Sequence, residues 1–269
     1  MKIIYCGDIV ARPGREAVLR ELPNMRDLYR PDVIIVNAEN AAHGFGLTPG
    51  ICRDLLEKGA DFIVTGNHVW NQREIIPFLN DSKQIIRPLN YPADLPGKGF
   101  GEIELPSGKK IVITQVLGRL FMEAVDCPAR ALDQLLNQYK LGGNAAAIFV
   151  DVHAEITAEK LTLGHYLDGR VSAVIGSHTH VPTADARLLE KGTAYMTDVG
   201  MCGDYNSVIG FEKEEPINRL NRRYTGGRLV PAKGSGTVCG VLIETDDHNG
   251  LAKKILPFQL PILNQPKND

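Results

Sequence analysis

Five short segments of the sequence carry carboxylate, carboxamide and imidazole side chains, which are the groups that divalent transition metals bind. Each segment follows a short apolar run of the kind that forms a buried strand. In open α/β sheets, ligands bind beyond the carboxyl ends of the strands. We therefore expect these segments to converge on one edge, although they are distant in sequence. Their residues are Asp8, Glu39, Asn40, Asn67, His68, His153, His178 and His180.

The number of candidate ligands predicts two metal ions that share a bridging group. A single ion takes about four protein ligands, and two ions about 3.5–4 Å apart can clamp the attacking and leaving oxygens of a phosphoryl transfer. Taken alone, each segment has a simpler explanation, such as a helix N-cap for Asp8 or a satisfied buried histidine for His153. The His178–Thr179–His180 pattern after a strand is harder to explain in that way. Five such segments in one chain favour a metal centre.

The elements that must hold these segments alternate between strand and helix in the first half of the chain. Apolar runs predict strands at 2–6, 32–36 and 61–65. Helical spacing predicts a helix over 14–28 and another over 48–58, with Thr48 as N-cap and Pro49 at the first helical position. Strands that alternate with helices indicate a parallel α/β sheet.

The second half is richer in strands. Residues 101–105 and 110–115 flank a turn signal at 106–108 and predict a hairpin. We expect helices at 129–139 and 158–167, and strands at 146–152, 172–175, 184–189, 194–196, 238–244 and 253–258. Residues 201–236 are rich in Gly, Arg and Glu and predict a long excursion. With no linker in between, we expect one domain over 1–262 and a tail at 263–269.

The composition excludes several classes of protein. The 269 residues are 43% hydrophobic and carry a net charge of -2, which fits a folded chain and argues against a DNA-coating protein. Five scattered cysteines without a CxxC pair favour a reducing compartment over a disulfide framework. We expect no signal peptide, because Asp8 interrupts the apolar run at the start, and no membrane helix, because no run approaches about 20 apolar residues. We expect a cytoplasmic protein that acts on neither DNA nor membranes.

In order along the chain, GD at 7–8, an acid at 39, GNH at 66–68, His153 and GSHTH at 176–180 resemble the calcineurin-like metallophosphoesterases. This resemblance implies an α/β fold of the four-layer αββα sandwich type with a dinuclear centre. The segments GDIVARPGR, NAENAAHGFGLT, TGNHVWNQ, DVHAE, GSHTHVPTAD and TDVGMCG look like one branch, the YmdB-like bacterial 2′,3′-cyclic-nucleotide 2′-phosphodiesterases. The resemblance runs from residue 1 to about 260.

Three departures from the wider superfamily match that branch. Val10 stands where the first motif usually has a histidine, and Glu39 stands where the bridging group is usually Asp. Asn40 is then available to replace the missing histidine. Val69 follows the GNH motif in place of the usual acid, which in the wider superfamily orients the histidine.

The resemblance implies a ligand set and a mechanism. One ion would be held by Asp8, Glu39, Asn40 and His180, and the other by Glu39, Asn67, His153 and His178. Iron is the first candidate, with Mn, Zn and Co as alternatives. Metal-bound hydroxide would attack phosphorus and His68 would act as general acid. A 2′,3′-cyclic nucleotide such as 2′,3′-cAMP would give the 3′-monophosphate.

Other functions remain open at this point. The same metals could serve a phosphatase of phosphoproteins or phosphomonoesters, or a regulatory protein that binds metal without catalysis. A nucleotide-binding domain without metals would leave the paired histidines unexplained. RNA ends as substrates and a homo-oligomer also stay open. The substrate pocket is expected between the 43–47 and 201–230 loops.

Further residues have weaker signals. Asp198 could orient a ligating histidine or could cap a turn. We interpret Trp70 as a packing residue, and the basic run of Arg219, Arg222, Arg223 and Arg228 as a solvated loop.

Overall fold

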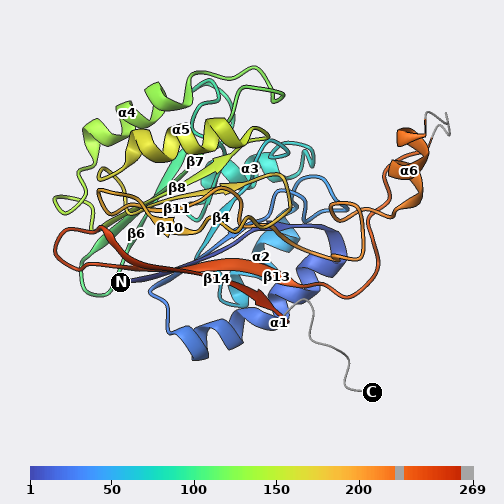
Figure 1. Ribbon diagram of the computed structural model, residues 1–269, viewed down its shortest axis with the longest axis horizontal. Coiled ribbons are helices and arrows are strands. Elements are labelled where there is room, and N and C mark those ends of the chain that lie inside the picture. The colour runs from blue at the N-terminus through green and yellow to red at the C-terminus, as the bar shows by residue number, and fades with distance from the viewer. Residues whose placement is uncertain (222–226, 262–269) are drawn as a thin grey trace.

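Two six-stranded sheets face each other in the computed structural model, which describes residues 1–221 and 227–261 (Figure 1). The first sheet has the order β14 (Ala252–Leu260), β13 (Val238–Thr245), β1 (Lys2–Cys6), β3 (Val33–Asn37), β4 (Phe62–Val64), β5 (Ile85–Ile86). The second has the order β10 (Arg187–Leu188), β11 (Ala194–Met196), β9 (Ala173–Ser177), β8 (Ala147–His153), β7 (Lys110–Leu117), β6 (Phe100–Glu104). A small sheet pairs β2 (Asp8–Ile9) with β12 (Met201–Cys202).

Helices cover both outer faces, so that the architecture is a four-layer αββα sandwich (Figure 1). The first sheet is covered by α1 (Ala11–Tyr29), α2 (Pro49–Glu57) and α3 (Ile75–Asp81), and the second by α4 (Pro128–Gln138) and α5 (Thr157–Leu167). The short helix α6 (Glu214–Leu220) projects from the body of the molecule. The fold class predicted from the sequence is confirmed.

The central strands are apolar on both faces because both faces are covered. In β1, Ile3 and Tyr5 point into the space between the sheets, whereas Ile4 and Cys6 pack under the helices of the first layer. This two-residue alternation follows from strand geometry. Parallel pairing of β1 with β3 and of β3 with β4 brings their carboxyl ends to the same edge. In the second sheet, β7, β8 and β9 are parallel in the same way.

Most predicted elements are present, with ends that differ by a few residues. Thr48 caps α2 by accepting a hydrogen bond from the Ile51 amide, and Pro49 begins the helix, as predicted. The hairpin of β6 and β7 is confirmed. The first sheet is not parallel throughout, since β13 pairs antiparallel with β1. The strand predicted at 184–189 is only Arg187–Leu188.

Several elements were not predicted. Helix α3 is short and contains Pro77, and β5 has only two residues. The excursion predicted at 201–236 contains β12 and α6. Asp8 lies in β2, and the N-cap of α1 is Val10. The boundary at 262 and the tail at 263–269 lie outside the described residues, so the single-domain organisation stays a prediction.

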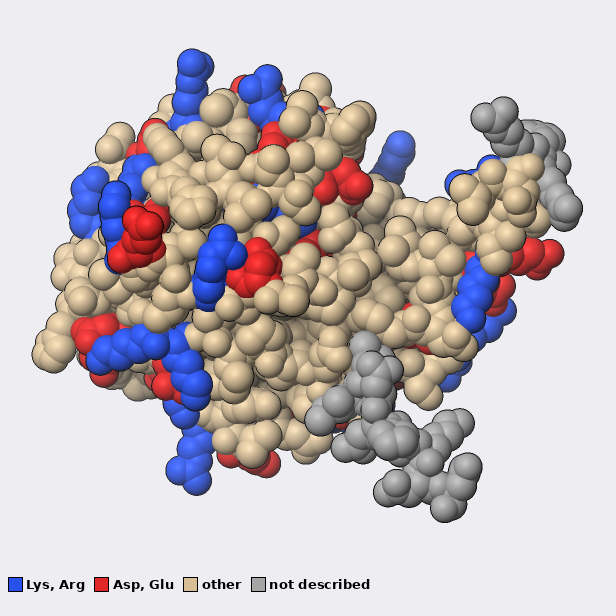
Figure 2. All heavy atoms as spheres, viewed as in Figure 1, with Lys and Arg blue, Asp and Glu red and all other residues tan. Residues whose placement is uncertain are grey.

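The surface shows no segregation of charge on the face in view. Basic and acidic side chains lie interspersed over that face (Figure 2). Among the helices that the structure describes, none has the length and apolarity needed to cross a membrane.

Candidate metal centre

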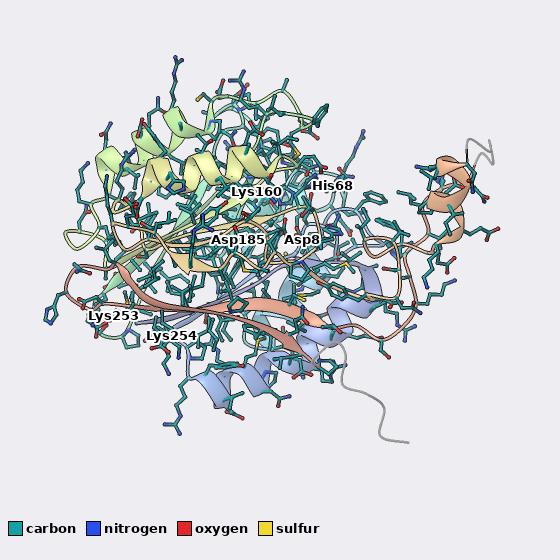
Figure 3. The ribbon with its side chains drawn as sticks, in the orientation of Figure 1. Asp8, His68, Lys160, Asp185, Lys253 and Lys254 are labelled. Carbon is teal, nitrogen blue, oxygen red and sulfur yellow. The ribbon has the colours of Figure 1, made fainter. Side chains whose placement is uncertain are left out.

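The candidate ligands come from the carboxyl ends of strands in both sheets. Asp8 follows β1, Glu39 and Asn40 follow β3, and Asn67 follows β4. From the second sheet, His153 ends β8, and His178 and His180 follow β9. Asp8, His68 and Lys160 are labelled near one another in Figure 3, well away from Lys253 and Lys254 on β14.

Within this region, two groups of side chains are close enough to hold metal ions. Glu39, His153 and His178 form one group, and Asp8, Glu39 and His180 form the other. In each group the ligand atoms lie within 4.8 Å of one another. Asn67 and Asn40 complete the groups: Oδ1 of Asn67 is 3.1 Å from Nε2 of His153, and Oδ1 of Asn40 is 3.2 Å from Nε2 of His180. Glu39 is common to both groups, in the place of a bridge.

Glu39 provides a test of whether a metal fits. Its side chain is 1% exposed, and neither carboxylate oxygen has a hydrogen-bond partner among the described residues. Nε2 of His153 lies 2.9 Å from Oε2. An unpaired charge is costly to bury, and a divalent cation between the two groups would compensate it. The donor set of carboxylate, carboxamide and imidazole groups suits such ions.

The protonation of the centre follows from its burial. Burial raises the pKa of Asp8 to about 6 and raises the pKa of Glu39. The same effect lowers the pKa of His153 to about 4 and that of His178 to about 2. The imidazoles of His153 and His178 are therefore neutral at pH 7, which is the form that binds metals.

His180 and His178 each have a polar partner on the side away from the centre. These partners determine which ring nitrogen can bind a metal ion. Nδ1 of His180 lies 2.8 Å from the carbonyl oxygen of Ile209. Since a carbonyl only accepts, Nδ1 carries the proton and Nε2 of His180 is free to bind. Nε2 of His178 lies 3.3 Å from a carboxylate oxygen of Glu155, which leaves Nδ1 facing the centre. Such outer partners orient metal ligands and set their tautomers.

The turn that carries the paired histidines has an unfavourable backbone. His178 and His180 have φ values of 95° and 65°, in the region that L-residues rarely adopt. Lys160, buried on α5, donates to the Ser177 carbonyl at 2.6 Å and to Oδ2 of Asp198 at 2.7 Å. Asp198 in turn accepts from the amide and the hydroxyl of Thr179. Asp198 thus holds the turn through Lys160 and Thr179 and is hydrogen-bonded to no imidazole among the described residues, so it positions the backbone.

Asp8 and Glu39 are linked by Asn37, which the sequence analysis did not select. Nδ2 of Asn37 donates to Oδ1 of Asp8 at 2.7 Å, and its Oδ1 accepts from the amide of Glu39 at 3.1 Å. The other oxygen of Asp8 accepts from the His178 amide at 3.0 Å. These contacts hold the Asp8 carboxylate and the backbone of Glu39 in position.

The GNH turn approaches Glu39 so closely that only glycine fits. Gly66 has φ of 58°, and a Cβ atom there would lie 2.5 Å from Cδ of Glu39. Its amide donates to Oε1 of Gln115 at 2.8 Å. This approach is what brings Asn67 and His68 to the centre.

His68 lies at the rim of the centre. Its side chain is 27% exposed, and Nε2 is 4.0 Å from Oε1 of Glu39. On the other side, Nδ2 of Asn71 is 3.2 Å from Nδ1. The ring of Phe45 packs edge-on against His68, and Phe211 packs against Phe45. Phe45 and Phe211, from the two loops expected to line the substrate pocket, thus touch beside His68. The pocket itself stays a prediction.

Two further histidines, and Trp70 and Arg219, lie outside the centre. His43 and His248 are exposed, and Trp70 packs against Tyr91 with ring centroids 4.7 Å apart. Arg219 forms an ion pair with Glu215. Arg222 and Arg223 lie outside the described residues.

A layer of polar residues behind the ligands was not predicted from the sequence. Gln115, Asp151, Ser177 and Lys160 are buried and hydrogen-bonded to the segments of the centre. Their signal was a polar side chain inside an otherwise apolar strand, as in VITQVL and IFVDVH. Such a residue needs a buried hydrogen-bond partner.

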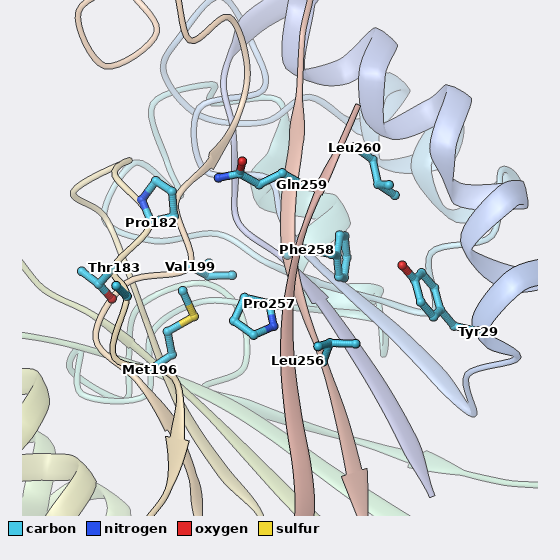
Figure 4. Close-up of a pocket in the computed structure, with 12 residues that line it drawn as sticks. Tyr29, Pro182, Thr183, Met196, Val199, Leu256, Pro257, Phe258, Gln259 and Leu260 are labelled. Atoms are coloured by element: carbon cyan, nitrogen blue, oxygen red, sulfur yellow. The ribbon is translucent and has the colours of Figure 1, made fainter. Parts of the chain in front are cut away.

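A separate apolar cavity of about 580 Å³ lies between β14 and the loop that follows His180 (Figure 4). Its lining includes Pro182, Met196, Val199, Pro257 and Phe258, and no carboxylate or imidazole. It is therefore not the metal centre.

Comparisons with known proteins agree with this geometry. A family model described as YmdB-like protein matches residues 4–258. A 2′,3′-cyclic-nucleotide 2′-phosphodiesterase of Bacillus subtilis is 44% identical over 255 residues, which are 95% of each chain.

Two solved structures are also similar. A hypothetical protein of Thermus thermophilus has a TM-score of 0.88 at 44% identity, over 96% of this chain and 98% of that one. A phosphatase of Mycoplasma pneumoniae has a TM-score of 0.89 at 33% identity, over 96% and 92%. The match of the family model over most of the chain, together with these relatives, shows that this chain belongs to the YmdB-like protein family.

Proposed function

We propose that the chain hydrolyses 2′,3′-cyclic nucleotides to 3′-monophosphates at a centre of two divalent metal ions. The observation that carries this proposal is the buried, unpaired carboxylate of Glu39 between two groups of ligands. The substrate class is supported by the activity named for the relative from Bacillus subtilis.

The ligand sets of the proposal follow the two groups. Asp8, Glu39, Asn40 and His180 would hold one ion, and Glu39, Asn67, His153 and His178 the other. Divalent ions bound there would supply Lewis-acid chemistry, which activates water and offsets charge on the phosphoryl oxygens. Iron is the first candidate; Mn, Zn and Co suit the same nitrogen and oxygen donors.

His68 supplies the proton that the leaving group needs. Hydrolysis forms a bond from water oxygen to phosphorus and breaks the bond from phosphorus to O2′, and the electron pair of that bond goes to O2′. An alkoxide is a poor leaving group, so a proton donor in reach speeds its departure by about 10²–10⁴-fold. His68 would act in its imidazolium form: it would give up the proton on Nε2, the nitrogen on the side of Glu39, and become a neutral imidazole whose Nδ1 faces the Asn71 amide. Because the ring is 27% exposed, it can be reprotonated from solvent.

Turnover of 2′,3′-cAMP by protein loaded separately with Fe²⁺, Mn²⁺, Zn²⁺ or Co²⁺ tests the proposal, with the products separated by chromatography. We expect 3′-AMP as the product and metal-free protein as the inactive control. An RNA oligonucleotide that ends in a 2′,3′-cyclic phosphate tests whether the substrate can be larger.

Three outcomes would contradict the proposal. Formation of 2′-AMP would mean that the other ester bond is broken. Faster hydrolysis of a phosphomonoester or a phosphopeptide would make the chain a phosphatase. Two bound ions without turnover of any of these substrates would leave a binding role.

A further inference from the structure

Behind His153 lies a buried chain of hydrogen bonds that ends in a carboxylate. Nδ1 of His153 is 2.8 Å from Oγ of Ser177, and this hydroxyl is 2.7 Å from Oδ1 of Asp151. All three side chains are fully buried. The strand register explains the contacts, because His153 pairs with Ser177 across β8 and β9, and Asp151 lies two residues before His153 on the same face of β8.

The other oxygen of Asp151 has partners whose orientation is fixed. Oε1 of Gln115 accepts from the amides of Thr65 and Gly66. Its Nε2 must therefore be the atom that faces Oδ2 of Asp151, at 2.5 Å. The hydroxyl of Tyr5 donates to the same oxygen at 2.7 Å. Asp151 thus accepts two hydrogen bonds at Oδ2 and meets Ser177 at Oδ1, as expected of a carboxylate.

We infer that Asp151, acting through Ser177, fixes the tautomer of His153 that can bind a metal. A serine hydroxyl has one proton to donate. When Ser177 donates it to the Asp151 carboxylate, its oxygen can only accept from His153, so the imidazole proton is on Nδ1. The unprotonated Nε2 then faces Oε2 of Glu39 at 2.9 Å and Oδ1 of Asn67 at 3.1 Å. Asp151 and Ser177 are positioning residues for His153, as Ile209 and Glu155 are for the other two histidines.

The inference rests on the proposed ligand role of His153, and Asp151→Asn tests it. The donors at Oδ2 hold the carbonyl of the new amide, so its NH₂ group faces Ser177. Ser177 then accepts from that group and donates to Nδ1 of His153, which moves the imidazole proton to Nε2. We expect the affinity for the second Zn²⁺ ion to fall by about 10–100-fold, with the first ion retained.

Ser177→Ala separates this role from simple support of the structure. It deletes both hydrogen bonds between His153 and Asp151 but imposes no tautomer on His153. We therefore expect a smaller loss of Zn²⁺ affinity than with Asp151→Asn. In the double variant, removal of the serine hydroxyl should restore the affinity of Asp151→Asn to that of Ser177→Ala. Tyr5→Phe leaves the hydrogen bonds from Asp151 through Ser177 to His153 intact and is the matched control.

Zinc titrations and ¹⁵N NMR of the imidazole give the readouts, and neither needs turnover. In alkaline buffer the metal-free parent should carry the His153 proton on Nδ1, and Asp151→Asn should carry it on Nε2. A parent with the proton on Nε2 would overturn the inference, even if Asp151→Asn fails to fold. A larger loss of Zn²⁺ affinity in Ser177→Ala than in Asp151→Asn would also overturn the inference. A parent that binds fewer than two Zn²⁺ ions would instead contradict the proposed metal centre.

Discussion

The metal centre and its rim are built in opposite ways. In the centre, Asp8 and His153 are fully buried. Asp8 accepts hydrogen bonds from Asn37 and from the His178 amide, and His153 is hydrogen-bonded to the buried Ser177. At the rim, His68 is partly exposed and is held by one exposed amide and the edge of one aromatic ring. Tight ion binding needs ligands that do not move, whereas a proton donor must exchange with solvent. The difference separates the residues expected to hold ions from the residue expected to move a proton.

Among the substitutions that test this difference, Glu39→Gln should have the largest effect on metal content and turnover. The amide loses the charge and one of the two oxygens in the bridging position, so both ions should be lost and turnover should fall to background. Elemental analysis of the purified variant measures the loss. Asn40→Ala is the matched control and should lose one ion only. Two ions at parental occupancy in Glu39→Gln would remove Glu39 from the bridge.

Lys160→Met breaks the support behind the centre. It leaves the Asp198 carboxylate buried without its cation, and such a loss destabilises by about 3–5 kcal/mol. Urea unfolding measures the change in the free energy of unfolding. The exposed pair of Arg12 and Glu16 provides the control, because Arg12→Met should change stability by less than about 1 kcal/mol. Equal changes in the free energy of unfolding for the two substitutions would mean that the buried Lys160–Asp198 pair adds no more stability than an exposed pair.

Removal of the metals should destabilise the centre and leave the rest of the fold in place. An ion at 100 times its dissociation constant stabilises the folded state by about 2.7 kcal/mol per site. Urea unfolding of chelated and reloaded protein should show a difference of this order for each ion. The same free energy of unfolding with and without metal would show that no ion binds preferentially to the folded chain.

Asn71→Ala should have the smallest effect, because it removes one exposed hydrogen bond from His68. A bond of that kind contributes about 0.5–1.5 kcal/mol, so we expect kcat for 2′,3′-cAMP to fall by up to about tenfold with metal content unchanged. Arg73→Ala, in the same turn and also exposed, should leave kcat at the parental value. A loss of metal from Asn71→Ala would place this residue in the centre instead of at the rim.

The convergence of the strand ends could be predicted from the sequence because it depends on local patterns. An apolar run followed by Asp8, or by Asn67 and His68, shows both the strand and the edge at which it ends. The short helix at 75–81 could not be predicted in this way, because a segment of seven residues that contains a proline is too short to show a helical period.

The support behind the ligands could not be predicted because it depends on register between distant strands. In the sequence, Asp151 is a single polar residue in an apolar strand. Only the fold shows that β7 places Gln115 beside it and that β1 brings Tyr5 within hydrogen-bond distance. Asp198 had two equal interpretations, and its contacts with Lys160 and with the Thr179 amide distinguish them.

The most direct test of the division between centre and rim is His68→Ala, measured for metal content and for turnover of 2′,3′-cAMP on the same sample. The exposed His248 provides the control substitution His248→Ala. We expect two ions per chain in both variants, and turnover slowed by about 10²–10⁴-fold in His68→Ala alone. Loss of an ion from His68→Ala, or turnover at the parental rate with both ions bound, would contradict the account.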